Sequence, residues 1–106
     1  MVELGKNLEL AEKWSKTFKI MGDPTRLKLL SAIHYAGQHV YAVSELAEVA
    51  GIRVATASAS LRAMEQNGVV ESARDGRVIR YAIADDGVHR LLHWIGTTHD
   101  TDNHTH

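Results

Sequence analysis

The sequence contains no cysteine and only one proline. The absence of cysteine excludes disulfide bonds, thiolate metal ligands and a catalytic thiol in this chain. No stretch approaches the ~18 consecutive apolar residues that a membrane span requires, and the first residues lack the basic and apolar regions of a secretory leader. We therefore expect a cytoplasmic protein without a membrane partner.

Aromatic residues are also scarce, at 6% of the 106 residues, whereas 44% of the residues are hydrophobic and 24% are charged. This composition suits one globular domain over residues 1–106 and leaves little room for a second. Because proline and aromatic residues are few, a mainly helical structure without long irregular loops is expected.

The formal net charge of −1 hides an uneven distribution along the chain. Between residues 53 and 80, five arginines stand against three acidic residues, whereas Arg90 is the only formal cation against four aspartates after residue 80. Five of the seven histidines also lie after residue 80, and residues 99–106 form a polar, histidine-rich tail. The basic middle predicts contact with nucleic acid, and the acidic end predicts a different role.

Amphipathic helices are expected at both ends of the domain. Apolar side chains recur every three or four positions over residues 6–21 and again over about 86–98, which places them on one face of a helix. Asp23 and Pro24 are typical of a helix start, so a separate helix is expected to begin there and to end at Gly37.

Residues 44–67 have the pattern of a helix-turn-helix. Ser44 can cap a short helix that ends at Ala50, residues 51–53 contain a glycine turn, and a longer helix follows over 54–67.

A β-hairpin is expected directly after these helices, over residues 69–83. Two segments rich in β-branched residues, 69–74 and 78–83, surround Asp75 and Gly76, a strong signal for a tight hairpin turn. The hairpin would form a wing. The sequence thus predicts a mainly α fold with a small β-hairpin, that is, a winged helix-turn-helix.

In such a fold, the second helix enters the major groove of double-stranded DNA. Small polar side chains there reach base edges, while arginines hold phosphates. The predicted base-reading residues are Thr56, Ser58 and Ser60. The predicted phosphate-binding residues are Arg53 and Arg62, together with Arg74 and Arg77 at the tip of the wing. For any one of these residues the alternative is a solvated position without a contact.

Over about residues 8–98, the chain resembles the ArsR/SmtB family of bacterial metal-sensing repressors. The resemblance rests on five stretches of sequence, which are Met21–Leu30, Ser44–Ala47, Ser58 with Leu61–Arg62, Asn67–Val70, and Asp75–Arg77 through Tyr81. It implies a homodimer that is formed through the first and last helices, that binds operator DNA and that releases it when an inducer binds. It also implies DNA contact at Ser58 and at the wing arginines.

The chain departs from the metal sites of this family. The cysteine pair that some relatives carry before the helix-turn-helix is absent, with Ala42 at the position concerned. Relatives that sense zinc, cobalt or nickel have Asp-x-His at the start of the last helix and a second pair near its end. Here Asp85 matches, but Gly87 replaces the histidine, and Thr98 and Thr101 stand at the second pair.

The remaining candidate metal ligands are Asp85, Asp86, His89, His93 and His99. His89 and His93 are four residues apart, hence about 40° apart on a helix, so two imidazoles could share one metal ion. In the alternative arrangement the last helix continues, and antiparallel pairing of the last helices brings His99 and Asp102 near Asp85 and Asp86 of a second subunit. His34 and His39 lie near the end of the second helix and are expected to be cap or surface residues.

These observations predict a transcriptional repressor that a divalent metal ion releases from its operator. Zinc is the metal ion that we expect in this role, followed by nickel or cobalt. The alternative is a winged-helix regulator of the same family that does not sense metal. From another class, a small metal-dependent hydrolase is disfavoured, because the sequence has no His-Glu-x-x-His, nucleophile elbow or phosphate-binding glycine loop. We expect no enzymatic activity.

Overall fold

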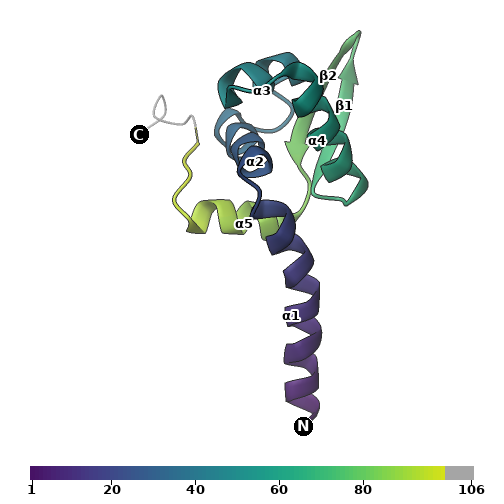
Figure 1. The fold of residues 1–106 in the computed structure, drawn as a ribbon, viewed down its shortest axis with the longest axis vertical. Coiled ribbons are helices and arrows are strands. Elements are labelled where there is room, and N and C mark those ends of the chain that lie inside the picture. The colour runs from purple at the N-terminus through teal and green to yellow at the C-terminus, as the bar shows by residue number, and fades with distance from the viewer. Residues whose placement is uncertain (100–106) are drawn as a thin grey trace.

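The computed structural model describes residues 1–99. These residues form five helices and one two-stranded antiparallel hairpin (Figure 1), which confirms the predicted winged helix-turn-helix fold. No helix in this part of the chain is long and apolar enough to cross a membrane. The elements are α1 (Val2–Met21), α2 (Pro24–Ala36), α3 (Val43–Ala50), α4 (Val54–Gln66), β1 (Val70–Asp75), β2 (Val78–Ile83) and α5 (Asp86–Trp94).

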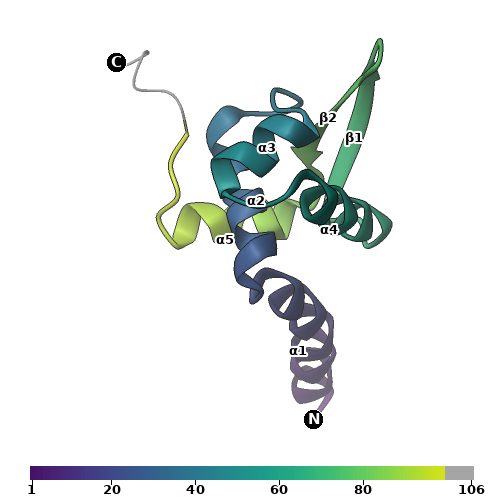
Figure 2. The ribbon, with the colours of Figure 1, turned by 45° about the horizontal axis from the view of Figure 1, so that its top comes forward.

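Helix α2 occupies the centre of the fold and packs against α1, α3, α4, α5 and β2 (Figures 1 and 2). Leu29, Leu30 and Ile33 of this helix are fully buried. As the sequence predicts, Asp23 caps the helix, because its carboxylate accepts a hydrogen bond from the backbone N–H of Arg26 at 3.0 Å. The core therefore forms on the buried face of α2, while Lys28 and Tyr35 of the same helix are exposed.

Helix α1 projects from this body (Figure 1) and begins four residues before the predicted start at residue 6. Its end is held by Arg26, whose Nε donates to the carbonyl oxygen of Ile20 at 2.8 Å and whose Nη2 donates to that of Lys19 at 3.2 Å. These bonds satisfy carbonyl groups that the last turn of a helix leaves without partners. Arg26 thereby joins α1 to the start of α2.

The helix-turn-helix consists of α3 and α4. Helix α3 begins earlier than predicted, with Ala42 rather than Ser44 at the N-cap, because the Glu45 carboxylate accepts a hydrogen bond from the Ala42 N–H at 2.9 Å. Gly51 then ends the helix with φ +71°, a left-handed conformation that a glycine adopts readily.

In the wing, Asp75 pairs with Val78, so Gly76 and Arg77 form the two-residue turn. The turn lies one residue later than the predicted Asp75–Gly76 position.

The predicted helix over 86–98 is too long, because α5 ends at Trp94. Gly96 has φ +102°, and the backbone N–H of Thr97 donates to the carbonyl oxygen of Leu92 at 3.1 Å. The chain therefore turns back at Gly96 instead of continuing the helix. The part of the predicted tail after His99 lies outside the described residues.

Gly87 lies in the first turn of α5, directly under the indole of Trp14. A methyl group on Gly87 would overlap the indole. The missing side chain therefore allows α1 to approach α5.

Gly87→Ala should lower the free energy of unfolding by about 1 kcal/mol, because the Trp14 indole must leave its packed position. Gly5→Ala is the matched control, since no other side chain approaches Gly5 in α1. It should raise the free energy of unfolding by roughly 0.5–1 kcal/mol. Urea unfolding measures both changes, and a gain at both positions would contradict this packing.

Candidate DNA-binding surface and histidine cluster

Helix α4 presents the predicted base-reading side chains unequally. Thr56 is exposed, whereas Ser58 and Ser60 are half-buried on the flanks of the helix. Arg62 Nη1 donates to Ser58 Oγ at 2.8 Å, so this hydroxyl also positions an arginine. Arg53 is exposed at the N-cap of α4. The exposed side of α4 therefore combines hydroxyl groups with two cations.

The wing lies next to α4 (Figures 1 and 2) and adds two further cations. Arg74 and Arg77 are exposed near the hairpin turn, and neither forms an ion pair within residues 1–99. Arg80 has a structural role instead, because it donates to the carbonyl oxygen of Val40 at 2.9 Å and lies 3.8 Å from the Asp75 carboxylate. Exposed arginines are thus present both on α4 and on the wing that packs against it.

Four histidines converge where α5 crosses the end of α2: His34, His89, His93 and His99. Their candidate ligand nitrogens, one from each ring, all lie within 4.8 Å of one another. His34 is 3% exposed, whereas the other three rings are half-buried or exposed. We call this group the histidine cluster.

The cluster brings together three predicted metal ligands, His89, His93 and His99, and one residue, His34, that was not predicted to bind metal. The expectation that His34 is a cap or surface residue is wrong, because its ring is buried beneath α5 and the segment that follows. A signal was available, since His34 follows the buried Leu30 by four residues and so shares its face of α2. His39 lies outside the cluster and is 3.5 Å from the Glu71 carboxylate.

The two predicted aspartates do not join the imidazoles within the subunit. Asp85 caps α5, where its Oδ1 accepts a hydrogen bond from the backbone N–H of Val88 at 3.1 Å. Asp86 forms an ion pair with Arg90. Both carboxylates thus have partners at the opposite end of the helix from His93.

The surroundings of the cluster lower the pKa of two of its imidazoles, those of His34 and His93. Burial, reinforced by the neighbouring His99, His93 and His89, lowers the pKa of His34 to about 4. Desolvation, together with His99 and His89, also lowers the pKa of His93. A metal ion binds the neutral ring, so these rings can coordinate at neutral pH without first losing a proton.

An apolar surface runs along α1 and the end of α5. Phe18 and Ile95 are about half exposed, and Trp94 is 83% exposed. Trp14 and Leu91 are half-buried between them. Leu10 and the other side chains except Trp94 line two shallow hollows along the helices, and Trp94 lines a third hollow with Trp14 and Leu91. Such a continuous apolar surface is typical of a protein interface.

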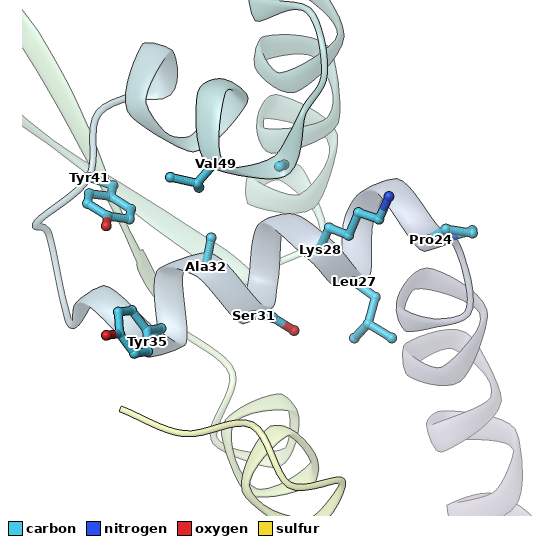
Figure 3. Close-up of a pocket in the computed structure, with 9 residues that line it drawn as sticks. Pro24, Leu27, Lys28, Ser31, Ala32, Tyr35, Tyr41 and Val49 are labelled. Atoms are coloured by element: carbon cyan, nitrogen blue, oxygen red, sulfur yellow. The ribbon is translucent and has the colours of Figure 1, made fainter. Parts of the chain in front are cut away.

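A larger open hollow of about 900 Å³ lies between α2 and α3 (Figure 3). Leu27 and Ala32 line it from α2, and Val49 lines it from α3. Lys28 supplies its cationic group. The size and mostly apolar lining would suit a small organic ligand.

Known proteins share this architecture. A family model described as a helix-turn-helix domain matches residues 21–73, half of the chain. One solved structure is the homodimeric winged helix-turn-helix DNA-binding domain of Mb0332 from Mycobacterium bovis, a possible ArsR-family transcriptional regulator. It superposes with a TM-score of 0.69 at 29% identity and covers 85% of this chain and 81% of its own. The chain belongs to the ArsR/SmtB family of winged helix-turn-helix regulators.

Two relatives are named for metal resistance. The probable mercury resistance operon repressor of Streptomyces lividans is 37% identical over 78 residues, which cover 74% of this chain and 60% of that protein. The cadmium resistance transcriptional regulatory protein CadC of Listeria innocua is 32% identical over 75 residues, or 71% of this chain and 61% of that protein. The chain thus spans about three fifths of the length of these two relatives. As a member of this family, the chain is a DNA-binding transcriptional regulator and not an enzyme.

In protein treated with a chelator, His34 should make the free energy of unfolding depend on pH. Its pKa is about 4 in the folded chain and returns to about 6.5 on unfolding. Between these values only the unfolded chain takes up the proton. Stability is therefore complete above pH ~6.5 and falls by up to about 3 kcal/mol as the pH drops toward ~4. Urea unfolding should show this slope in the wild type and in His39→Gln, but a smaller slope in His34→Gln; equal slopes in all three proteins would contradict the assignment.

Proposed function

We propose that this ArsR/SmtB protein is a dimeric repressor that a divalent metal ion releases from its operator, with zinc first and nickel or cobalt next. The convergence of four imidazoles within 4.8 Å carries this proposal. Imidazole nitrogen suits these borderline cations, whereas magnesium and calcium favour oxygen ligands. The names of the two metal-resistance relatives support a metal as the class of inducer.

We assign the dimer interface to the apolar surface of α1 and α5. In a single subunit this surface leaves Phe18, Trp94 and Ile95 about half exposed or more. A two-fold dimer would cover the same surface on both subunits. The homodimeric state of the Mycobacterium bovis domain supports this assignment.

In DNA binding, Thr56, Ser58 and Ser60 would read base edges, while arginines of α4 and the wing would hold phosphates. The dimer must present its two copies of α4 at the spacing of the two operator half-sites. The metal ion lowers DNA affinity only if it binds better to a dimer with a different spacing. Because the cluster and the proposed interface share α5, metal binding can alter that spacing.

The alternative proposal is a winged-helix transcriptional regulator of the same family that does not sense metal. The hollow between α2 and α3 favours this alternative, because it could hold an organic ligand against α3 of the helix-turn-helix. Under this alternative, DNA affinity would be indifferent to zinc and would respond to a small molecule.

Arg77→Gln should weaken binding to every DNA sequence and reduce the slope of log affinity against log salt by about one unit, since one phosphate contact is lost. Arg90→Gln is the matched control, because Arg90 pairs with Asp86 on α5. Fluorescence anisotropy at several salt concentrations measures both slopes. Identical slopes for wild type and Arg77→Gln would remove the wing from the interface.

Zinc should weaken operator binding of the wild type by about 5- to 150-fold, the usual range of allosteric coupling. A double variant, His89→Gln with His93→Gln, should bind DNA as the metal-free wild type does and should not respond to zinc. Anisotropy titrations with and without chelator measure this response. Unchanged DNA affinity of the wild type at saturating zinc would favour the alternative regulator.

A further inference from the structure

The neighbours of His34 fix the tautomer of its neutral ring. Thr97 Oγ1 donates its only proton to the carbonyl oxygen of Leu92 at 2.8 Å. The same hydroxyl oxygen lies 2.9 Å from His34 Nδ1, so it accepts the proton that Nδ1 carries. In a neutral ring, Nε2 of His34 then has a free lone pair. That atom is buried and has no hydrogen-bond partner among the described residues.

The tautomer of the His99 ring is also fixed by a hydrogen bond at Nδ1. Its Nδ1 lies 3.0 Å from the backbone carbonyl oxygen of His34, which can only accept a hydrogen bond, so Nδ1 carries the proton. The lone pair of His99 Nε2 therefore points toward His93 Nε2, 3.0 Å away.

His93 Nε2 also lies 3.1 Å from His89 Nε2. A proton on His93 can satisfy only one of its two close neighbours. A cation between the rings would satisfy all four nitrogens at once.

We propose that each subunit binds one divalent cation, such as Zn²⁺ or Co²⁺, through four imidazoles, those of His34, His89, His93 and His99. The site uses no carboxylate and no ligand from the other subunit. Its regulatory meaning rests on the function proposed above, but the coordination itself does not. Four nitrogens at tetrahedral bonding distance from Zn²⁺ lie about 3.3 Å apart. The observed limit of 4.8 Å therefore requires only small movements of the side chains.

The supporting contacts match those of a metal site. Metal-bound histidines usually donate their second N–H to a carbonyl, carboxylate or hydroxyl, which fixes the ring and the coordinating nitrogen. Thr97 does this for His34, and the His34 carbonyl does it for His99. Softer cations that prefer thiolate find no cysteine in this chain.

The cation would link the segment after α5 to the end of α2, because it would bind both His99 and His34. Trp94 and Ile95 lie between the ligands His93 and His99 in the sequence, and both belong to the apolar surface assigned to the dimer interface. Coordination would therefore fix the position of these two side chains relative to α2. This connection gives the metal a direct route to the dimer geometry.

Titration of Co²⁺ into the chelator-treated full chain, without DNA, tests the site. The wild type should bind one Co²⁺ per chain with the strong visible absorption of tetrahedral cobalt. His34→Gln should lose that absorption and should weaken binding by more than the roughly 10- to 100-fold that loss of a supporting contact costs. Because His34 is buried, His99→Gln repeats the test from the segment that follows α5, with the same expected result.

Three further variants give the experiment its controls. Thr97→Val keeps all four ligands but loses the contact that fixes His34, so Co²⁺ affinity should fall by about 10- to 100-fold while the shape of the spectrum is kept. His39→Gln should match the wild type. Phe18→Glu puts a charge on the proposed dimer interface, and its separated subunits should still bind Co²⁺ with the same spectrum.

The results distinguish a failure of the four-imidazole site from a failure of the proposed function. Wild-type Co²⁺ binding in both His34→Gln and His99→Gln would overturn the site, as would wild-type binding only at millimolar cobalt. Release of DNA by zinc from these two variants as well as from the wild type would preserve the proposed function and overturn the four-imidazole site. The expected cobalt spectra together with zinc-independent DNA binding would preserve the site and overturn the proposed function.

Discussion

The burial of one face of α2 by the elements packed around it is the constraint on which the rest of the subunit depends. Polar groups near a buried helix face must find partners inside the protein, because water cannot reach them. At the first turn, Arg26 meets this requirement by binding the last carbonyls of α1. At the last turn, His34 meets it through Thr97 and His99, which draws the segment after α5 over the end of α2. The end of α1 and the segment after α5 are thus attached to the two ends of α2.

Helix α5 has a different role on each of its faces. Val88 and Leu92 are buried in the core, His89 and His93 belong to the histidine cluster, and Leu91 faces the apolar surface shared with α1. A helix of nine residues is too short to bend appreciably, so a displacement at one face moves the other two. Under the proposed function, this arrangement would allow metal binding within one subunit to change its position relative to the other.

The position of the cluster also accounts for the departure from the metal-site pattern of the family. Gly87 stands where the resemblance to the family implies a histidine ligand, and the Trp14 indole lies against it. A side chain fits there only if the indole moves away. The imidazoles instead gather further along α5, on the face toward α2. In this chain, the packing of α1 on α5 takes the place of a ligand side chain at position 87. His34, at the end of α2, supplies a different candidate ligand.

The local features of this protein were determined by the sequence itself. Periodicity, the Asp23 cap and the glycine turn at the hairpin predict the helices and the wing, because each depends on neighbours a few residues away. The four-residue spacing of His89 and His93 is local in the same sense. Only the tertiary structure decided that His34 and His99 join them. His34 comes from a distant helix whose burial depends on all its neighbours, and His99 reaches the cluster because Gly96 adopts a left-handed conformation that turns the chain back.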